Sequence, residues 1–378
     1  MRIAVNTRLL VPSKMDGIGR FTFESLKIIA QENPEDEFVF IFDRKPPSEF
    51  KFGDNVELVS IGPPARHPIL WYIWFEHRLP NFINKGHFDL FLSPEGWISP
   101  RLNCPSLGVI HDLNFVHSPE NIIYSHRKYL EIFFPKFAKR ANRIATVSEY
   151  SKKDITETYG IKSNQIDVVY NGANQIFQPI DSITKKTIQE DFSLGLPYFI
   201  FIGTLHPRKN LENLFIAFNE FKKKTKSDVK LLIVGNKKWW PNTLEDTFQK
   251  LEHKADIIFC GRQSDEMLAK LLGSAEALTY LPFFEGFGIP ILEAFQAQVP
   301  VITSNTTSMP EVAKGGAILC DPTDVKAISD ALLEIIEDKT LRKKLIEIGN
   351  QRAQDFSWKK TADLLWDSML KTLNQKGD

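Results

Sequence analysis

Two glutamates, Glu285 and Glu293, lie on either side of a glycine loop in the run FFEGFGIPILE. An apolar stretch precedes the loop, and Pro290 follows it at a position where the first turn of a helix accepts proline. A strand, a glycine loop and a helix in this order are typical of a ligand site in an open α/β sheet. Gly286 and Gly288 would let the backbone approach a ligand, and free amide groups at the helix start attract phosphate.

The spacing of the two carboxylates assigns them to different parts of one ligand. Glu285 would lie in the loop, level with the reacting end of the ligand, and Glu293 would lie about two helical turns further on. Carboxylates accept hydrogen bonds from pairs of hydroxyl groups, which sugars and ribose both present. The alternative is a surface loop with two solvated glutamates, and the glycine loop beyond a predicted strand argues against it.

A cationic pair follows another predicted strand. That strand ends in Gly203, and Arg208 and Lys209 come shortly before a helical pattern at 211–224. Arg208 can bind two oxygens of a diphosphate, and Lys209 adds a point charge beside a helix N-terminus. The alternative is a solvated basic turn in which Asn210 caps the helix.

A second glycine loop, with Gly17, Gly19 and Arg20, follows the first predicted strand. Thr22 stands where a dinucleotide-binding fingerprint requires its third glycine, which argues against an NAD-dependent oxidoreductase. Taken alone, the loop is equally well explained as a structural turn.

Two further pairs of residues lie at the ends of predicted strands. His111 and Asp112 follow a strand at 106–110, and Gly261 and Arg262 follow another apolar run. A lone histidine is usually structural, but the carboxyl ends of strands are where open sheets bind ligands. Gly261 would suit a flat base laid against the backbone, whereas Arg262 is equally well explained as an exposed cation in a turn.

Short apolar runs alternate with helical patterns along the whole chain, which predicts parallel sheets covered on both faces. The predicted strands lie at 3–5, 38–42, 56–61, 90–92, 106–110, 143–147, 167–169, 199–203, 230–234, 257–259, 277–281 and 299–303. The pattern restarts near residue 199, after a polar, proline-containing stretch at 180–197. We therefore predict two doubly wound α/β domains, at 1–185 and 186–357, and a C-terminal helix at 358–378 that packs back on the first domain.

Composition excludes several classes of protein. The chain has 378 residues with 47 Lys+Arg and 47 Asp+Glu, so no global basic field exists to attract nucleic acid. Its three cysteines are far apart, which predicts neither a disulfide framework nor a structural zinc site. No run of about 18 apolar residues occurs, so we expect a cytoplasmic protein without a membrane-spanning helix. The aromatic segment at 71–75, near Arg66 and Arg78, is either a buried helix face or a surface for an acceptor or membrane.

Many ordered motifs resemble the family 4 (group 1) retaining glycosyltransferases, which have the GT-B fold of two Rossmann-like domains facing a central cleft. The matching motifs are GIGRF, HDLNF, VSEYSKKDI, VVYNGANQIFQP, GTLHPRKNLENL, FCGRQSDEMLAKLLGSAEALTYLPFFEGFGIP, SMPEVAKGGAILCDPTD and RAQDFSW. The resemblance covers almost the whole chain. It implies transfer of a sugar from a nucleotide diphosphate donor with retention of anomeric configuration.

The resemblance also implies roles for individual residues. Glu285, Arg208, Lys209 and His111 would be catalytic, with His111 beside the donor sugar. Arg20 and Asp112 would lie on the acceptor side. The implied donor site consists of Gly17, Gly19, Gly203, Arg208, Lys209, Gly261, Arg262, Glu285, Gly286, Phe287, Gly288, Ile289 and Glu293.

We expect no metal ion and no cofactor. No Asp-any-Asp motif stands at a strand end and no histidines have metal-ligand spacing, so Arg208 and Lys209 would neutralise the diphosphate instead. The combination of HDL and PRKN is most similar to bacterial mannosyltransferases of cell-surface polysaccharide synthesis, which implies GDP-mannose and a saccharide or lipid-linked acceptor. Such acceptors would favour peripheral contact with the inner face of the cell membrane. The alternatives are a nucleotide-sugar epimerase or hydrolase of the same fold, or a non-catalytic nucleotide-sugar binding protein.

Overall fold

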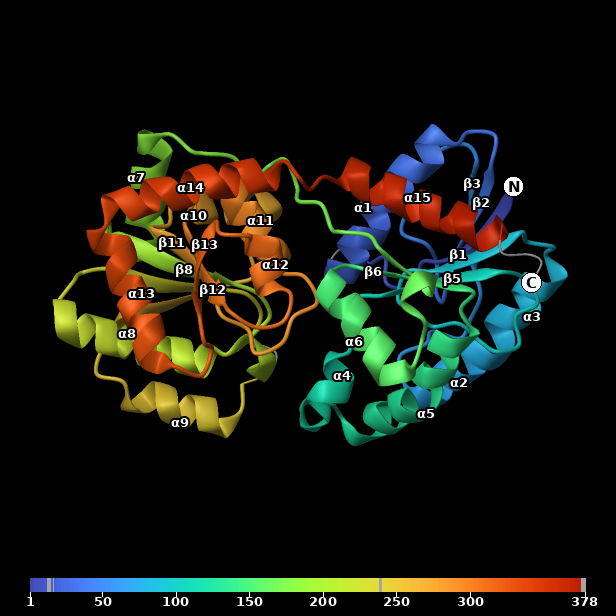
Figure 1. Ribbon diagram of the computed structural model, residues 1–378, viewed down its shortest axis with the longest axis horizontal. Helices are drawn as coiled ribbons and strands as arrows, with labels where there is room; N and C mark the ends of the chain where they lie inside the picture. Colours follow the sequence, from blue (N-terminus) through green and yellow to red (C-terminus); the bar gives the residue numbers. More distant parts are fainter. Residues whose placement is uncertain (12–14, 16, 238–239, 375–378) are drawn as a thin grey trace. The chain divides into compact units, whose positions relative to one another are not determined.

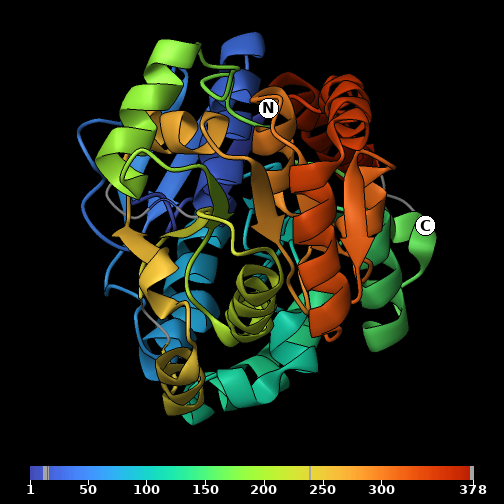
Figure 2. The ribbon, with the colours of Figure 1, turned by 90° about the vertical axis from the view of Figure 1, so that its left-hand side faces the viewer.

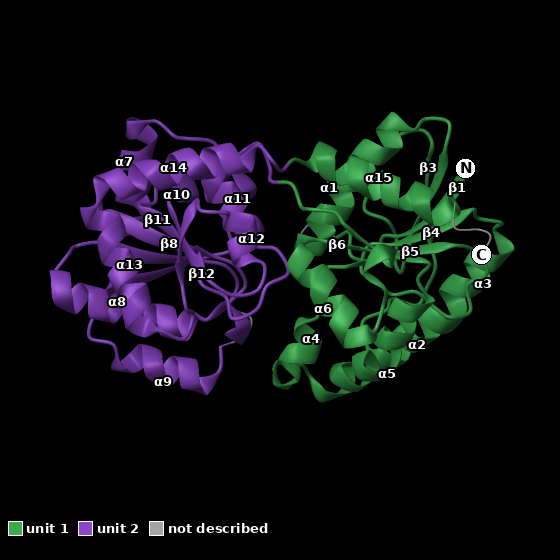
Figure 3. Ribbon diagram, in the orientation of Figure 1, with its two compact units in different colours: residues 1–172, 357–378 green, residues 173–356 purple. Residues whose placement is uncertain are grey.

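The computed structural model describes residues 1–11, 15, 17–237 and 240–374 (Figure 1). The chain forms two compact units (Figure 3). Unit 1 consists of Met1–Gly172 and Ser357–Asp378, and unit 2 consists of Ala173–Phe356. Each unit is built on a parallel sheet of its own, as the alternation of apolar runs and helical patterns predicted.

The sheet of unit 1 has seven strands within the described residues, in the order β3-β2-β1-β4-β5-β6-β7. The central strands are apolar on both faces because helices cover the sheet on both sides. The strands are β1 (Arg2–Asn6), β2 (Glu37–Phe42), β3 (Val56–Ser60), β4 (Leu90–Ser93), β5 (Ser106–Ile110), β6 (Arg143–Thr146) and β7 (Ile166–Val168).

The helices of unit 1 include the last helix of the chain, α15, which packs on α1 and on β4, β5 and β6. Its apolar face, with Ala362, Leu365 and Met369, is buried in that contact. The helices are α1 (Gly17–Glu32), α2 (Pro68–Ile73), α3 (Leu79–Lys85), α4 (Asn114–His117), α5 (Tyr124–Arg140), α6 (Glu149–Tyr159) and α15 (Trp358–Asn374), with a π-helical turn, η2 (Trp74–Arg78), between α2 and α3.

The sheet of unit 2 has six strands within the described residues, in the order β10-β9-β8-β11-β12-β13. These are β8 (Tyr198–Ile202), β9 (Lys230–Val234), β10 (Ile257–Gly261), β11 (Ala277–Tyr280), β12 (Val301–Ser304) and β13 (Ala317–Cys320).

Helices cover the sheet of unit 2, and α8 packs with α13 while α10 packs with α11 (Figure 2). The helices of this unit are α7 (Ser182–Ser193), α8 (Leu211–Thr225), α9 (Asn242–Lys250), α10 (Asp265–Gly273), α11 (Ile289–Gln296), α12 (Met309–Ala313), α13 (Val325–Glu337) and α14 (Lys339–Ala353).

The division between the units differs from the predicted boundary at 185/186, which would cut through α7. This helix packs on α10 and β10 of unit 2. Lys185 on α7 binds Glu276 at 2.9 Å, and Arg342 on α14 binds the same carboxylate at 2.5 Å. The chain therefore passes into unit 2 after Gly172, and it returns to unit 1 at Ser357, one residue before the predicted 358.

Candidate active site

The order of strands in unit 2 creates a switch point between β8 and β11. The chain runs from β8 to β9 on one side, and later crosses from β10 to β11 on the other side of β8. The loops that follow β8 and β11 therefore diverge at the carboxyl edge of the sheet, which is where open α/β sheets bind ligands. Arg208 and Lys209 follow β8, and Glu285 follows β11, so the topology brings these three predicted residues together.

Arg208, Lys209 and Glu285 form one ion-paired cluster. Arg208 Nη1 donates to Glu285 Oε2 at 2.5 Å and to the Phe284 carbonyl at 3.2 Å. Lys209 Nζ donates to the same carboxylate oxygen of Glu285 and to Tyr280 Oη, the latter at 2.5 Å. The backbone amide of Phe283 donates to the Arg208 carbonyl at 2.8 Å, which ties the two loops together.

The cluster holds Glu285 in its ionised form. Burial alone would raise the pKa of this carboxyl, but the charges of Arg208 and Lys209 and hydrogen bonds from Lys209 and Tyr280 outweigh burial and lower the pKa to about 2. The side chains of Lys209 and Glu285 are only 9% and 15% exposed, so water screens their interaction weakly. Burial, and then the charge of Glu285, raises the pKa of the Tyr280 hydroxyl well above its ordinary value, so that hydroxyl stays protonated.

The two cations lie on a 3-10 turn, Pro207–Lys209, which connects β8 to α8. Asn210 then adopts a left-handed conformation with φ of 59° and begins the helix. Its side chain does not cap the helix, as the basic-turn interpretation required, but donates to the Pro322 carbonyl at 2.6 Å. The turn is therefore fixed by a contact to the loop after β13, and it presents Arg208 and Lys209 to the loop after β11.

The glycine loop between Glu285 and Glu293 has the predicted form. Gly288 has φ of 92°, and an added Cβ would lie 2.9 Å from Met309 Cε, so this position suits glycine alone. Ser308 donates its hydroxyl to the Glu285 carbonyl at 2.8 Å and holds the start of the loop. Gly286 and Phe287 are buried in the loop, α11 begins at Ile289, and Glu293 is only 6% exposed on that helix.

The region expected to contact the nucleobase is a part of the carboxyl edge of the sheet that consists of glycines. Gly203, Gly235 and Gly261 follow or end the adjacent strands β8, β9 and β10. Gly235 N donates to the Gly261 carbonyl at 2.9 Å, and a Cβ on Gly235 would lie 1.8 Å from the Gly203 carbonyl oxygen. Any side chain at 235 would separate the strands, so the closeness of these backbones depends on glycine. Gly261 and Arg262 are exposed beside this edge.

The predicted residues of unit 1 lie at the start of α1 and after the end of β5. Gly17, Gly19 and Arg20 lie in the first turn of α1, and Asp16, which begins the predicted loop, lies outside the described residues. The next residue of α1, Phe21, meets the ring of His111 edge-on at 5.0 Å between centroids. The structure therefore places the start of α1 beside the end of β5.

His111 and Asp112 both contact the backbone of unit 1. A ring nitrogen of His111, Nε2, lies 2.9 Å from the Pro94 carbonyl oxygen. Asp112 Oδ1 accepts from the backbone amide of Asn114 at 3.0 Å, and so stabilises the turn before α4.

Sequence reasoning missed an ion pair at the switch point of unit 1, between β1 and β4. Arg8 Nε donates to Glu95 Oε1 at 3.0 Å, and Asn6 Nδ2 donates to the same oxygen at 2.7 Å. The guanidinium of Arg8 lies 5.4 Å from the ring centroids of Phe75 and Trp97. The position of Arg8, three residues after the predicted strand at 3–5, was the only indication in the sequence.

Most side chains of the aromatic segment at 71–75 are wholly or partly buried in the core of unit 1. These side chains are therefore not available to contact a membrane or an acceptor. Trp74 and Phe75 are fully buried. Trp71 donates its indole N–H to the Ala65 carbonyl at 2.8 Å, and Trp74 donates to the Ile61 carbonyl at 2.7 Å. Of these five residues, Tyr72 alone is exposed.

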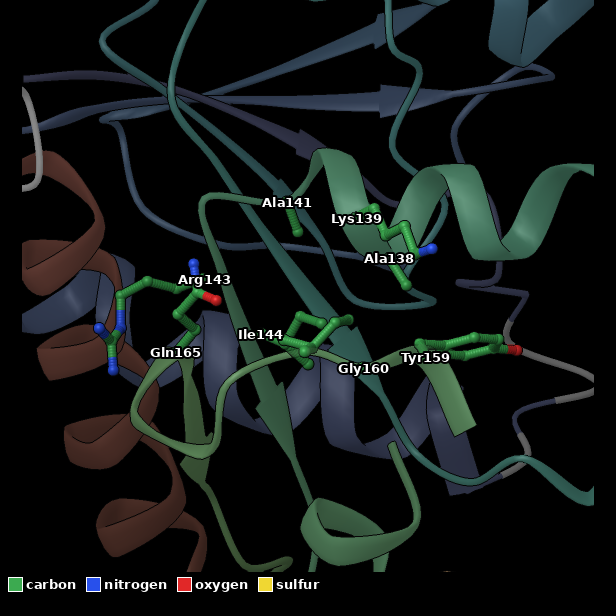
Figure 4. A pocket seen from close by; sticks show the side chains of 9 residues that line it. Ala138, Lys139, Ala141, Arg143, Ile144, Tyr159, Gly160 and Gln165 are labelled. Atoms are coloured by element: carbon green, nitrogen blue, oxygen red, sulfur yellow. The ribbon is translucent and has the colours of Figure 1, made fainter. Parts of the chain in front are cut away.

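Unit 1 also has a surface pocket of about 390 Å³ that includes none of the predicted site residues (Figure 4). Residues before and at the start of β6 line part of the pocket, at the amino end of that strand and away from the carboxyl ends where His111 lies. Arg143 in its wall is paired with Asp167 at 2.7 Å. The lining residues are Ala138, Lys139, Ala141, Arg143, Ile144, Tyr159, Gly160, Ile161 and Gln165.

Within residues 1–11, 15, 17–237 and 240–374, no group of three or more His, Cys, Asp or Glu side chains is placed to hold a metal ion. None of the helices in this part of the chain combines the length and the apolar character needed to cross a bilayer.

Comparison with known proteins identifies the family. A model described as glycosyl transferases group 1 matches residues 182–352, and one described as glycosyltransferase family 4 matches residues 17–175. The O-antigen chain mannosyltransferase RfbU of Salmonella typhimurium is 30% identical over 271 residues, which are 71% of each chain. The chain belongs to the group 1 glycosyltransferases of family 4. This glycosyltransferase is also 27% identical to O-antigen chain mannosyltransferase B of Escherichia coli over 357 residues, 91% of this chain and 93% of the relative.

Solved structures show that the glycosyltransferase has the GT-B fold with two Rossmann-like domains. Sucrose-phosphate synthase from Thermosynechococcus elongatus superposes with a TM-score of 0.80 at 18% identity, covering 100% of both chains. WaaG, a glycosyltransferase involved in lipopolysaccharide biosynthesis, gives 0.74 at 15% identity, covering 99% of this chain and 100% of its own. HepE from Anabaena, solved with UDP-glucose, gives 0.76 at 15% identity, covering 98% of this chain and 100% of its own.

Proposed function

We propose that this glycosyltransferase transfers mannose from GDP-mannose to a saccharide or lipid-linked acceptor, with retention of anomeric configuration, in the synthesis of a cell-surface polysaccharide. The observation that carries the donor site is the cluster of Arg208, Lys209 and Glu285 at the switch point of unit 2. Mannose as the sugar rests on the two relatives named O-antigen chain mannosyltransferases. A nucleotide sugar as the donor class is supported by HepE, a structural neighbour solved with UDP-glucose.

The charge of the cluster suits a diphosphate. Two cationic side chains, those of Arg208 and Lys209, meet the single carboxylate of Glu285 at the carboxyl edge of the sheet. Amide groups at the start of α11 lie at the end of the same glycine loop as Glu285 and would add further donors. We place the donor diphosphate against Arg208 and Lys209, where these charges stabilise the leaving group as the bond to the sugar breaks.

Glu285 and Glu293 then take different parts of the donor. Glu285 binds hydroxyl groups of the sugar, and Glu293 on α11 binds the ribose. His111 of unit 1 stabilises positive charge that develops at the anomeric carbon, and Asp112 orients the acceptor hydroxyl. The acceptor oxygen forms a bond to the anomeric carbon on the face from which the diphosphate leaves, and a phosphate oxygen of the leaving group takes the acceptor proton.

This reaction needs no metal ion in our proposal. Arg208 and Lys209 supply the positive charge that a divalent ion would otherwise bring to the diphosphate. No cofactor is needed either, since the nucleotide sugar is itself a substrate.

We also propose peripheral contact of unit 1 with the inner face of the cell membrane, through a face of α2 and α5. The two helices pack together, and Ile69, Tyr124 and Ile132 on them are 64%, 71% and 51% exposed. Lys128 and Lys136 lie on α5 near the rings of Tyr124 and Phe133, so cations accompany the apolar side chains. Exposed apolar residues with flanking cations favour an anionic lipid surface.

Flotation with vesicles of phosphatidylglycerol and phosphatidylethanolamine at low salt tests this contact. We expect wild-type protein to float and the double variant Tyr124→Asp, Ile132→Asp to remain at the bottom. The matched control is Ile183→Asp, since Ile183 is an exposed isoleucine of unit 2. Flotation of the double variant at the wild-type level would remove this face from the proposal.

The donor is tested by thermal shift with GDP-mannose, GDP-fucose, UDP-glucose and UDP-N-acetylglucosamine. A ligand that binds only the folded protein raises its Tm by mass action, so GDP-mannose should give the largest increase. A larger increase with a UDP-sugar would overturn the choice of donor. Turnover of GDP-mannose is then followed with and without saccharide acceptors, because turnover that no acceptor stimulates would favour the hydrolase or epimerase alternative.

A further inference from the structure

Tyr280, which was not among the predicted site residues, is the last residue of β11 and contacts the cationic cluster. It is 1% exposed, and its ring stacks at 24° on the ring of Phe201 in the neighbouring strand β8, with centroids 6.3 Å apart. The loops that carry Arg208 and Glu285 leave the sheet from these two strands. The ring is therefore held between strands of the sheet, beside the side chains that would meet a donor.

The hydroxyl of Tyr280 accepts a hydrogen bond from Lys209 Nζ at 2.5 Å, and the same ammonium group donates to the Glu285 carboxylate. The ammonium group of Lys209 also lies 4.8 Å from the centroid of the Tyr280 ring. The hydroxyl and the ring of Tyr280 therefore both contact the ammonium group that pairs with Glu285.

We propose that Tyr280 is a positioning residue that fixes the charge of Lys209, and with it the Lys209–Glu285 pair, for the donor diphosphate. A lysine side chain has four rotatable bonds, and holding its charge in one place costs rotamer entropy. The ring and hydroxyl of Tyr280 reduce that cost before the ligand arrives, because they hold the ammonium group from one side. Tyr280 itself touches no ligand. This inference rests on the donor site proposed above.

Unit 2 provides a matched control. Tyr198, in the adjacent strand β8, is also fully buried, and its hydroxyl donates to the Leu271 carbonyl at 2.7 Å. Tyr280→Phe and Tyr198→Phe each remove one buried hydroxyl and keep the ring. Both variants should lose stability by a similar amount, but Tyr280→Phe alone should change the binding of phosphate groups.

The experiment is calorimetric titration of the wild-type chain and both variants with GDP and with guanosine. We expect Tyr280→Phe to lower GDP affinity about tenfold, the loss typical of one hydrogen bond to a charged group, and to leave guanosine affinity unchanged. Tyr198→Phe should leave both affinities at the wild-type value. An equal loss for GDP and guanosine in Tyr280→Phe would mean that the residue only supports the fold, and would overturn the inference.

A double variant separates positioning from a direct effect. In a Lys209→Met background, Tyr280→Phe should cause no further loss of GDP affinity, because the charge that it positions is gone. Losses that add independently would contradict the inference even if Tyr280→Phe alone weakened GDP.

UDP with uridine, and inorganic pyrophosphate, serve as parallel probes. If wild-type protein binds UDP and not GDP, the choice of GDP-mannose as donor is wrong. The affinities of the variants and of wild type for UDP and uridine then decide the role of Tyr280. Absence of binding to all three phosphate probes would overturn the donor site and the inference together.

Discussion

Glu285 Oε2 accepts a hydrogen bond from Arg208 Nη1 at 2.5 Å, although the two residues are 77 positions apart in the chain. Both residues were predicted to contact the donor, and the structure shows that they also contact each other. Lys209 binds the same oxygen. The anionic carboxylate of Glu285 therefore already lies against the cations that we assign to the diphosphate. Removal of the Glu285 charge should for this reason affect diphosphate binding as well as sugar transfer.

Loss of either cation should nearly abolish transfer. Arg208→Ala or Lys209→Ala removes a charge-assisted contact to the leaving group, which should cost about 2–4 kcal/mol of transition-state stabilisation. Steady-state kinetics on folded variants gives this value, with Lys186→Ala on the exposed side of α7 as the control. Turnover near the wild-type value in both variants would remove them from the site.

The two glutamates should separate in their effects on binding and turnover. Glu285→Gln should lower the turnover number if the carboxylate meets the reacting sugar. The expected change is an increase of about 2–4 kcal/mol in the activation free energy. The variant should bind bare GDP at least as tightly as wild type, because an internal anion that opposes the diphosphate is gone.

Glu293→Gln should instead weaken the binding of bare GDP by about 1.5–3 kcal/mol, since the ribose is present with or without the sugar. Calorimetry with GDP and kinetics with the full donor measure both effects. If Glu285→Gln weakened GDP more than Glu293→Gln did, the two assignments would be reversed.

Stability should depend on pH through Glu285. Its pKa is about 2 in the folded chain against an ordinary value of 4.5, so its ionised form stabilises the fold above pH 4.5, and this contribution is lost as pH falls toward 2. The shift corresponds to on the order of 3 kcal/mol. The Tm difference between wild type and Glu285→Gln should therefore narrow from pH 5 to pH 3, while Glu337→Gln at an exposed site tracks wild type throughout. A constant difference across this range would show that the ion pair contributes little.

The predicted strands are confirmed because buried parallel strands are continuous apolar runs, which the sequence displays directly. One observed strand, β13, was not predicted. Its four residues include the exposed Leu319, so its apolar run is too short to be recognised. The boundary at 185/186 was wrong because the position of α7 depends on Glu276 and Arg342, far along the chain, and not on local composition.

The residues of the Arg208, Lys209 and Glu285 cluster were predicted from the sequence, but their contacts with one another were not. The types and spacing of Arg208, Lys209 and Glu285 indicate their chemistry, whereas their mutual ion pairs follow only from the neighbouring positions of β8 and β11. Tyr280 was missed because a tyrosine at the end of an apolar strand has the pattern of a core residue. Its hydroxyl meets Lys209 only because β8 and β11 are neighbours in the sheet.

Transfer should not depend on a divalent ion. Arg208 and Lys209 already bring two positive charges to the proposed diphosphate position, so activity should persist in excess EDTA. Complete loss of activity, restored by manganese or magnesium, would contradict this prediction and would place a metal ion at the diphosphate.

The position of the nucleotide itself is the most direct test of the donor site. A crystal structure of the full chain grown with GDP should show the diphosphate against Arg208 and Lys209 and the ribose within hydrogen-bond distance of the Glu293 carboxylate. The guanine should lie against the backbone edge at Gly261. Density for GDP at any other place in unit 2, or in unit 1, would contradict the account.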